Sequence, residues 1–330
     1  MIRALFLKAA GAATVAVGGL DVWDPARPQI RVLVSPDVRG AMPQVAPDGT
    51  FAFGGKRWRG APSTVRLPSG TMGLVTTLDV DAYLQGVVPL EAPPSWPAAA
   101  LEAQAIVART FALGRVTLSR PWDVRADDSD QRWGGVEVET PSTSAAVAAT
   151  RGRTLTYGGG PAAVFYSACC GGHTADIAAV WNGTPLPYLR GVPDPYCAAA
   201  PGYRWERDVA LERASEAFRA RLGGPLRGTA LGAPDDTGRP HSVLLLGATV
   251  ATIALADFRR TLGYDTVRSL WLSALRIDAS QAAPRLVIEG CGHGHGVGLC
   301  QWGSRFFAAA GASAADILAF YFPGTALSGG

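Results

Sequence analysis

Charge is scarce in this sequence and is not concentrated in one sign. Charged residues make up 17% of the 330, the net charge is +3, and no run of lysines and arginines occurs. Because proteins that bind a nucleic acid backbone carry a strongly basic surface, we exclude nucleic acid as a partner. The hydrophobic fraction of 48% is that of a globular protein, so the 40 glycines and 24 prolines indicate many turns in a folded chain.

Long apolar runs are also missing. In residues 1–20, Arg3 lies near the start and small and apolar residues follow it, which is the pattern of a signal peptide. Between Lys8 and Asp21 the uncharged run is shorter than the roughly 20 residues that a membrane-spanning helix needs. We therefore expect export to the periplasm or to the cell-wall side of the membrane. A membrane anchor and a short buried helix are the alternatives for this segment.

Several catalytic signatures are absent. The chain has no Gly-x-Ser-x-Gly elbow, no His-Glu-x-x-His helix and no Cys-x-x-Cys pair. The glycine-rich stretch 290–303 has neither the Gly-x-Gly-x-x-Gly register nor a following Lys-Ser/Thr, so it is not expected to cradle phosphate. The acidic residues at 123, 127, 128 and 130 lack the spacing of an EF-hand and indicate a solvated loop.

What is present is a β-rich opening followed by mixed elements. Short strands are predicted at Gln29–Val34, Phe51–Phe53, Arg57–Gly60, Ser63–Leu67 and Leu74–Leu78. Later strands are predicted at Thr154–Tyr157, paired with Ala163–Tyr166, and at Ser242–Gly247 and Ala248–Leu255. Helices are predicted at Thr143–Thr150, Val209–Leu222, Ala256–Leu262, Ser304–Ala310 and Ala314–Tyr321. This predicts an α+β fold: a β-rich core of short strands with a few packed helices, an inserted α/β lobe at about 203–285, and a cleft.

One carboxylate, Glu91, lies between two proline-rich segments. The stretch reads Val87-Val-Pro-Leu-Glu-Ala-Pro-Pro-Ser-Trp-Pro97. Prolines fix their own φ and push the preceding residue away from the helical region. We therefore expect Glu91 on a rigid, extended connection, which suits a catalytic group. The alternative is a solvated loop carboxylate, which is the common state of a glutamate.

An amphipathic helix is predicted from Ser95, as its N-cap, to about Leu118. Its apolar positions recur at spacings of four, three and four, at Leu101, Ala105, Ala108 and Ala112. Gln104 and Arg109 project from other faces of this helix. Without further information they are ordinary surface residues.

The chain has five cysteines, an odd number: Cys169, Cys170, Cys197, Cys291 and Cys300. In an exported protein at least one thiol is therefore free, bound to a metal, or paired with another chain. A disulfide between Cys170 and Cys197 is our first expectation. The alternative is a structural zinc with ligands from the set Cys170, His173, Cys291, His293, His295 and Cys300.

Glycines alternate with other residues around two histidines in the stretch 290–303. This pattern implies unusual φ angles or a close approach to a ligand. We expect His293 and His295 on one side of an extended segment.

Three motifs occur in order along the chain. They are Val87–Glu91 followed by Ala103–Thr110, then Ser167–Thr174 with Val180-Trp and Tyr188-Leu-Arg, then Gly294–Gly303. Together they resemble the SpoIID/LytB family of peptidoglycan proteins, and the resemblance extends from about Gln29 to Leu327. The intervening lobe is similar too, in Gly238-Arg-Pro-His and Asp257–Gly263.

The resemblance implies an exported lytic transglycosylase whose catalytic domain is residues 29–330. It would act on peptidoglycan glycan strands, often strands already stripped of stem peptides, with other cell-wall hydrolases or amidases as partners. Glu91 matches the catalytic acid of the family. The resemblance further implies substrate-binding residues in the active cleft at Gln104, Arg109, Ser167, Thr174, His295 and Gln301. No catalytic metal or other cofactor is expected.

The chain also departs from the family pattern. Many relatives have Met after the catalytic glutamate, where this sequence has Ala92. Some relatives hold zinc with His and Cys ligands in the loop after the helix, where this sequence reads Asp127-Asp-Ser-Asp-Gln-Arg-Trp133. Zinc is therefore not expected in this loop.

A lytic reaction needs only one catalytic side chain. One carboxylic acid with a raised pKa can protonate the leaving oxygen, and its carboxylate can then accept the proton of the attacking C6 hydroxyl. The alternative is a pair of carboxylates, in which an acid from residues 123–130 supplies the second one. Aromatic faces that could hold the glycan are Trp96, Trp181, Tyr188 and Trp302. The rival functions are a non-catalytic glycan-binding or amidase-modifying protein and a metal-dependent hydrolase that uses the histidine and cysteine motifs.

Overall fold

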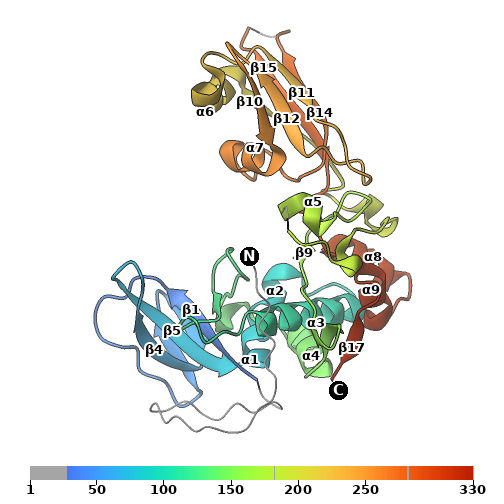
Figure 1. Ribbon diagram of the computed structural model, residues 1–330. Coiled ribbons are helices and arrows are strands. Elements are labelled where there is room, and N and C mark those ends of the chain that lie inside the picture. Colours follow the sequence, from blue (N-terminus) through green and yellow to red (C-terminus); the bar gives the residue numbers. More distant parts are fainter. Residues whose placement is uncertain (1–27, 182, 281, 330) are drawn as a thin grey trace. The chain divides into compact units, whose positions relative to one another are not determined.

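The computed structural model describes residues 28–181, 183–280 and 282–329. They form two compact units, each assembled from separate stretches of the chain (Figure 1). The first unit contains residues 28–94, 108–163 and 326–329, and the second contains the described residues of 95–107 and 164–325. The long helix α3 (Ala98–Gly114) begins in the second unit and ends in the first.

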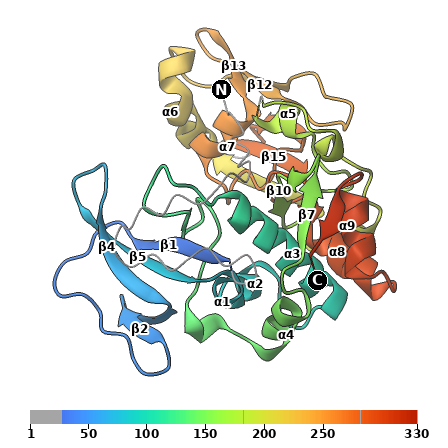
Figure 2. The ribbon, with the colours of Figure 1, turned by 60° about the horizontal axis from the view of Figure 1, so that its bottom comes forward.

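The first unit is organised around a four-stranded sheet of order β4-β5-β1-β6, of which β4, β5 and β1 are labelled in Figure 2. Its strands are β1 (Gln29–Ser35), β4 (Ala61–Arg66), β5 (Met72–Asp79) and β6 (Val124–Arg125). β1 runs antiparallel to β5 and parallel to β6, so that Val32 lies between Thr76 and Val124. A small apolar cluster packs against these strands and consists of Leu33, Leu67, Val75 and Trp122.

The other elements of the first unit are short. β2 (Thr50–Phe53) and β3 (Lys56–Arg59) form a hairpin, and β7 (Thr154–Tyr157) lies between β17 (Ala326–Ser328) and β8 (Gly160–Pro161). The helices are α1 (Val80–Gln85), α2 (Val88–Glu91), the C-terminal part of α3, the 3-10 turn η1 (Val136–Val138) and α4 (Pro141–Ala149). The Asp79 carboxylate caps α1 by accepting the backbone N–H groups of Asp81 and Ala82, at 2.8 and 3.3 Å.

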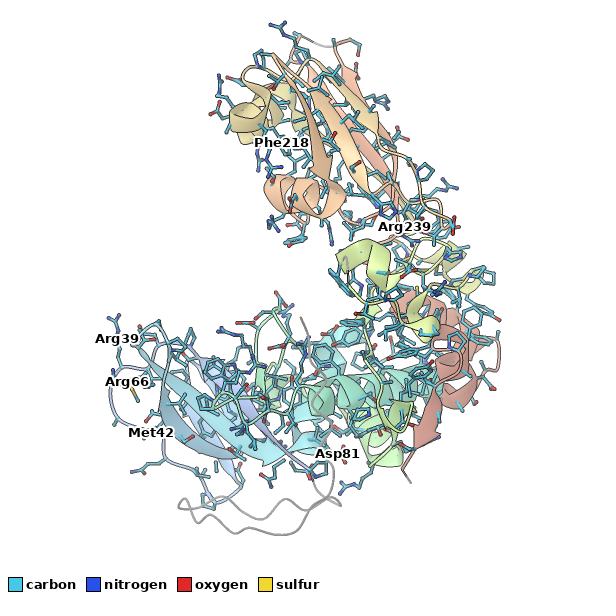
Figure 3. All side chains as sticks on the ribbon, in the orientation of Figure 1. Arg39, Met42, Arg66, Asp81, Phe218 and Arg239 are labelled. Carbon is cyan, nitrogen blue, oxygen red and sulfur yellow. The ribbon has the colours of Figure 1, made fainter. Side chains whose placement is uncertain are left out.

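The second unit contains two three-stranded antiparallel sheets (Figure 1). One has the order β10-β15-β14, formed by β10 (Arg204–Ala210), β14 (Leu272–Asp278) and β15 (Arg285–Cys291). The other has the order β11-β12-β13, formed by β11 (Gly228–Leu231), β12 (Ser242–Leu246) and β13 (Val250–Ala254). Helices α6 (Leu211–Leu222) and α7 (Leu255–Leu262) share one apolar core with these strands. Phe218, labelled in Figure 3, belongs to this core. Its ring stacks on that of Phe258 with centroids 5.5 Å apart.

The remaining part of the second unit carries most of the sequence motifs. Its elements are β9 (Tyr166–Ser167), α5 (Ile177–Trp181), the 3-10 turns η2 (Pro187–Leu189) and η3 (Tyr196–Ala199), β16 (Leu299–Cys300), α8 (Gln301–Ala309) and α9 (Ala314–Tyr321). β9 and β16 pair in parallel, which joins the second motif to the third. α9 begins with a capping box formed by Ser313 and Asp316.

The fold is α+β, as predicted. The strands predicted between residues 29 and 78 are confirmed, and so are the helices predicted near 143–150, 256–262 and 314–321. The strands β10, β14 and β15 were missed. β10 and β14 are partly exposed and carry charged residues, so they are not apolar runs, and β10 pairs with β15 far along the chain, which a local pattern does not reveal.

Four local predictions are wrong. Glu91 ends the one-turn helix α2, because Pro89 occupies the first turn of a helix, where its missing N–H costs no hydrogen bond. Helix α3 begins only at Ala98, after Pro97, so Ser95 is not its N-cap, and it ends at Gly114 instead of near Leu118.

The other two wrong predictions concern strands. The partners of β7 are β8 and β17, and not Ala163–Tyr166, because Tyr166–Ser167 pairs with β16 instead. The glycine-rich segment is not an extended strand either. Gly292, Gly294, Gly296 and Gly298 all have positive φ, between 75° and 107°, which turns the chain repeatedly.

The boundaries predicted for the lobe, residues 203 and 285, stay a prediction. Its residues belong to the second unit, and the apolar cluster that they share runs from Trp205 to Ile288. The signal-like segment 1–20 lies outside the described residues. Within the described ranges, no helix combines the length and the apolar composition needed to cross a membrane.

Candidate functional site

Glu91 is the last residue of α2 and is half-buried. Two backbone hydrogen bonds close the turn, from Leu90 N–H to the Val87 carbonyl at 3.0 Å and from Ala92 N–H to the Val88 carbonyl at 2.9 Å. At Ala92 the backbone returns to an extended conformation, with φ −135°. The carboxylate is therefore attached to a short helix with fixed geometry, and the flanking prolines stiffen the chain that follows.

A buried tyrosine lies near Glu91 in the first unit. Burial raises the pKa of Tyr83 well above its ordinary value, and the negative charges of Asp130 and Glu91 raise it further. The Tyr83 hydroxyl donates to Gln131 Oε1 at 3.4 Å, and its ring lies 5.7 Å from that of Trp133. The surroundings of Glu91 thus include an aromatic hydroxyl that stays protonated.

The acidic residues 123–130 have different environments. Asp123 is buried, and its carboxylate pairs with Arg31 at 2.7 Å and accepts the backbone N–H of Thr117 at 3.0 Å. Asp123 therefore holds the edge of the sheet together. Asp130 accepts the backbone N–H of Arg125 at 2.9 Å, and of these four acids only Asp130, like Glu91, acts on Tyr83.

The loop 127–133 does not fit the zinc that some relatives hold there. It contains no histidine or cysteine. Asp127 accepts a hydrogen bond from the Ser129 backbone at 3.0 Å, and the exposed Asp128 pairs with Arg132 at 3.3 Å. Scattered, exposed carboxylates of this kind are not a set of ligands for zinc.

Arg109 lies in the first unit and is completely buried. Its guanidinium pairs with Asp81 at 2.7 Å and donates to the Val147 carbonyl at 3.1 Å. Further hydrogen bonds of 3.3 Å reach Thr150 Oγ1 and the Arg153 carbonyl. Burial lowers the pKa of Arg109, and the nearby Asp81 opposes that shift. The residue joins α1, α3 and α4, so it has no exposed surface with which to contact a glycan.

Gln104 and Gln301 meet in the second unit. Gln301 Nε2 donates to Gln104 Oε1 at 3.4 Å, which joins α3 to the first residue of α8. Both side chains are buried. Among the described residues, the side-chain nitrogen of Gln104 has no hydrogen-bond partner, which is a costly state for a buried amide.

His295 lies beneath an exposed indole. Its imidazole is 5.1 Å from the ring of Trp181 and 6.4 Å from that of Phe165, measured between centroids. Nδ1 accepts the backbone N–H of Val297 at 3.0 Å, so the ring proton lies on Nε2, which is consistent with a hydrogen bond to the backbone of Tyr166. Burial lowers the pKa of His295 to about 4, and the positive charge of Arg259 contributes to the shift. At neutral pH this histidine is uncharged.

Ser167 and Thr174, which were predicted to bind substrate, accept hydrogen bonds from the backbone of loops in the second unit. Ser167 Oγ accepts the backbone N–H of Gly296 at 3.2 Å. Thr174 Oγ1 accepts the backbone N–H of Val192 at 2.7 Å. Both are buried, so they hold the second and third motifs in place.

His293 is set apart from His295. Its backbone pairs with Cys169 through two hydrogen bonds of 2.7 and 3.1 Å. Burial lowers the pKa of His293, as does the charge of Arg268, whose Nη2 lies 3.4 Å from His293 Nδ1. The two histidines therefore have different neighbours. The negative charge of Asp265 acts on His293 and opposes the lowering of its pKa.

Arg239 was not among the predicted site residues, although it lies in the Gly238-Arg-Pro-His segment that is similar to the family. This buried side chain donates to the Cys170 carbonyl at 2.9 Å, to the Thr174 carbonyl at 3.5 Å and to the His173 carbonyl (Figure 3). Its guanidinium also lies 4.4 Å from the ring centre of Trp271. Arg239 thus fixes the loop of the second motif, and only the tertiary structure brings the two together.

Of the aromatic residues expected to hold a glycan, Trp181 is the exposed one, with 44% of its surface accessible. Trp96 and Tyr188 are buried, and Trp302 is half-buried against Trp96 with ring centroids 5.1 Å apart. Next to Trp181, α5 borders a cavity of about 340 Å³ lined by Val180, Asp235, Arg239, His241 and Leu255 among others. An exposed indole beside a mainly apolar cavity that also contains polar side chains is a surface suited to a sugar.

All five cysteines are free thiols, so the predicted disulfide between Cys170 and Cys197 is not formed. Their sulfurs nevertheless lie 3.5 Å apart. Cys300 lies beside them, whereas Cys291 is elsewhere in the second unit.

Comparison with known proteins points to one family. Residues 68–157 match the SpoIID family model, described as stage II sporulation protein. An uncharacterized protein of Brachyspira hyodysenteriae is 32% identical over 259 residues, which are 77% of this chain and 68% of that protein. The stage II sporulation protein D of Bacillus subtilis is 27% identical, over 77% of this chain and 76% of its own length. The amidase enhancer of the same organism is 28% identical, over 74% of this chain and 40% of its own.

Proposed function

Because the chain belongs to the SpoIID/LytB family, we propose that it is a peptidoglycan lytic transglycosylase with Glu91 as its acid and base. The observation that carries the proposal is the position of Glu91. It lies within the segment that matches the family model, on a short rigid helix, half-buried and near a buried tyrosine. A fixed, partly desolvated carboxylic acid is what protonation of a leaving oxygen requires.

In the proposed reaction Glu91 acts twice. The carboxylic acid donates its proton to the glycosidic oxygen, the bond between that oxygen and C1 of MurNAc breaks, and an oxocarbenium-like centre forms at C1. The C6 hydroxyl of the same MurNAc then attacks C1, and its proton passes to the Glu91 carboxylate. The products are a GlcNAc 4-hydroxyl end and a 1,6-anhydroMurNAc end. Because no water enters, one carboxylate regenerates itself without a partner.

The second unit supports binding of the glycan. Trp181 presents an exposed indole over the neutral ring of His295, and the adjoining cavity offers the carboxylate of Asp235 and the imidazole of His241. Sugars combine apolar faces with hydroxyl groups, which suit an indole and polar side chains respectively. A glycan strand is a long polymer, so this surface can hold units other than the one that reacts.

The proposal is tested on denuded glycan strands. Wild-type protein should release fragments with 1,6-anhydroMurNAc ends, identified by mass spectrometry, and Glu91→Gln should lower the rate by about 10²- to 10⁴-fold. Glu137→Gln is the matched control, because Glu137 lies in the same unit and its exposed carboxylate pairs with Arg57 at 3.1 Å. The control should retain full activity.

Two results would reject the proposal. Products with reducing MurNAc ends would show that water is the nucleophile and that the enzyme is a hydrolase. An equal rate for wild type and Glu91→Gln would assign the chemistry to another residue.

A second function is favoured by the match to a protein named amidase enhancer. In this alternative the chain binds glycan and increases the activity of a cell-wall amidase without cleaving anything itself. Purified amidase would then release stem peptides faster when this protein is added, and Glu91→Gln would enhance the amidase as well as the wild type does. Loss of enhancement in Glu91→Gln would instead tie the effect to strand cleavage.

A further inference from the structure

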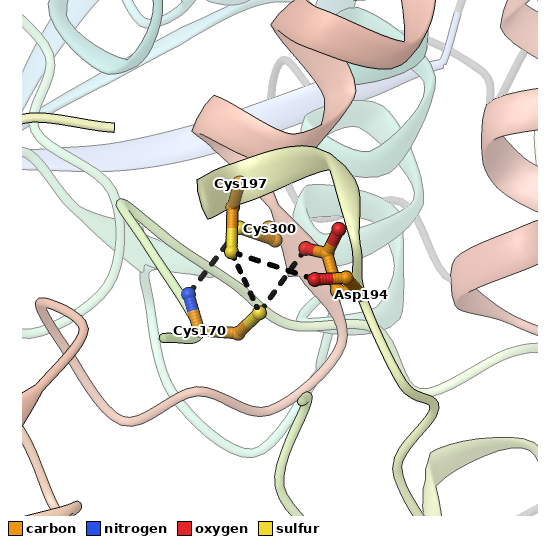
Figure 4. A group of neighbouring side chains, drawn as sticks. All are labelled: Cys170, Asp194, Cys197 and Cys300. Atoms are coloured by element: carbon orange, nitrogen blue, oxygen red, sulfur yellow. Dashed lines mark hydrogen bonds between the residues drawn. The ribbon is translucent and has the colours of Figure 1, made fainter. Parts of the chain in front are cut away.

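Four side chains with metal-binding atoms converge inside the second unit (Figure 4). The thiols of Cys170, Cys197 and Cys300 and a carboxylate oxygen of Asp194 all lie within 4.8 Å of one another. Cys170 Sγ is 3.5 Å from Cys197 Sγ and donates to Asp194 Oδ2 at 3.1 Å. All four residues are buried.

These ligand atoms come from three parts of the chain. Cys170 follows β9, Asp194 precedes η3, Cys197 lies within η3, and Cys300 ends β16 directly before α8. Each part is short and has little core of its own. A central ion would bind the three together, in the way that structural zinc stabilises small loop-rich regions.

Among the described residues, no cation forms an ion pair with Asp194, the acid of this cluster. Its carboxylate accepts hydrogen bonds from the Cys170 thiol, from the Tyr321 hydroxyl at 2.9 Å and from the Tyr196 backbone N–H at 3.0 Å, and it also interacts with the Cys300 thiol. The buried cation Arg239 is engaged with backbone carbonyls. Buried carboxylates are normally paired with a cation or coordinated to a metal, so this one lacks its usual partner.

The sulfur atoms also have the surroundings of metal ligands. Cys300 Sγ accepts two backbone N–H groups, from Cys170 and from Gly303, each at 3.3 Å. Cys300 is moreover the N-cap of α8, where the helix dipole favours a negative charge. Hydrogen bonds of this kind orient a thiolate toward its metal.

We propose that Cys170, Cys197, Cys300 and Asp194 bind a structural zinc ion. Tetrahedral zinc has bonds of about 2.3 Å to sulfur, so two thiolate ligands lie roughly 3.8 Å apart, close to the 3.5 Å between Cys170 and Cys197. Three soft thiolates with one carboxylate in a closed, buried set select zinc over Mg²⁺ or Ca²⁺, which prefer oxygen. With four protein ligands the site leaves no open position, so its role is structural.

A zinc ion here would support the third motif. Cys300 is followed at once by Gln301, whose amide meets Gln104, and Cys170 belongs to the loop that Arg239 fixes. The site is independent of the chemistry assigned to Glu91. Its loss should therefore lower stability in a protein of either proposed function.

Metal analysis of the purified full chain tests the proposal. We expect about one zinc per chain, and reconstitution with Co²⁺ should give the visible absorption of a tetrahedral thiolate site. Cys197→Ala and Asp194→Ala should each lower the zinc content at least about tenfold. Cys291→Ala is the matched control, because Cys291 is a buried cysteine of the same unit outside the cluster, and it should keep its zinc. Removal of zinc from the wild type should lower the Tm by at least about 5 °C.

The wild type alone can overturn the proposal, even where a variant fails to fold. Thiols are counted in denatured protein without a reductant. Five free thiols after removal of zinc support the site, since the chain has five cysteines. Absence of zinc with three thiols, which are five minus the two of one disulfide, would show that a disulfide has formed instead and would reject the proposal. Iron in place of zinc, or five thiols in protein isolated under zinc without any bound metal, would also reject the proposal.

Discussion

The indole of Trp181 lies over the imidazole of His295, with ring centroids 5.1 Å apart and an angle of 52° between the planes. The two rings come from α5 and from the glycine-rich third motif, more than a hundred residues apart in the chain. The indole is exposed, whereas the imidazole beneath it is held neutral by its surroundings. An uncharged platform of this kind can contact the apolar face of a sugar without losing the hydration of an ion.

Replacing the exposed indole should weaken glycan binding and leave the fold intact. We expect Trp181→Ala to raise the Kd for glycan strands by about 5- to 30-fold, because an aromatic anchor contributes about 1–2 kcal/mol. Tyr264→Ala is the matched control, since Tyr264 is an exposed aromatic residue of the same unit. Binding is measured by co-sedimentation with denuded strands. Equal affinities for the two variants would remove Trp181 from the binding surface.

The depressed pKa of His295 predicts a loss of stability in mild acid. The folded protein holds this histidine with a pKa of about 4, against 6.5 in an unfolded chain, so the unfolded state binds more protons between these values. Stability should therefore fall as the pH drops from about 6.5 towards 4. Because the ring is only half-buried, we expect a contribution of about 2 kcal/mol, below the full value of the shift.

Urea unfolding at pH 7.5 and pH 4.5 measures this effect. His295→Asn should lose less stability between the two pH values than the wild type does, since the titrating ring is gone. His241→Asn is the control, because His241 is exposed and loosely paired with Asp235 at 3.7 Å. Comparison among the three proteins cancels acid effects that they share. An identical pH dependence in all three would show that His295 does not contribute.

Arg109 should matter for stability and not for contact with substrate. Arg109→Met leaves the Asp81 carboxylate without its closest cation and two backbone carbonyls without a donor, so we expect a loss of about 3–5 kcal/mol. Adding Asp81→Leu should recover part of that loss, because no uncompensated charge then remains. Activity per folded molecule, measured well below the unfolding midpoint, should stay near that of the wild type. A lost activity with unchanged stability would restore the substrate-binding role that the family resemblance implies.

Gln104, in contrast to Arg109, should matter for activity and not for stability. Its buried amide nitrogen has no partner among the described residues, so replacing it with the similarly shaped Met removes a polar group that costs free energy. We expect Gln104→Met to keep or raise the Tm. If the glycan supplies the missing partner of the amide, the same substitution should lower the rate or the affinity for glycan. Gln301→Met, which removes the donor to Gln104, should lower the Tm slightly. A fully active Gln104→Met would show that the amide has no function.

Much of the local structure could be predicted from residues alone. β-branched strands, Gly turns and the helix that starts after Pro97 follow from backbone preferences that act over a few residues. Glu91 and its surrounding motif were recognisable in the same way. The conformation of Glu91 was not, because proline stiffens a helix start as readily as an extended segment, and only packing of α2 decides between them.

The sequence by itself determined the family, the α+β class and the candidate acid, since each of these depends on short segments in a fixed order. Only the tertiary structure decided that Arg109 is buried in an ion pair, that Arg239 fixes the second motif, and that three cysteines converge on Asp194. The physical reason is the same in each case. Contacts between residues 24 to 197 positions apart depend on how strands and helices pack, and no local preference of the chain encodes them.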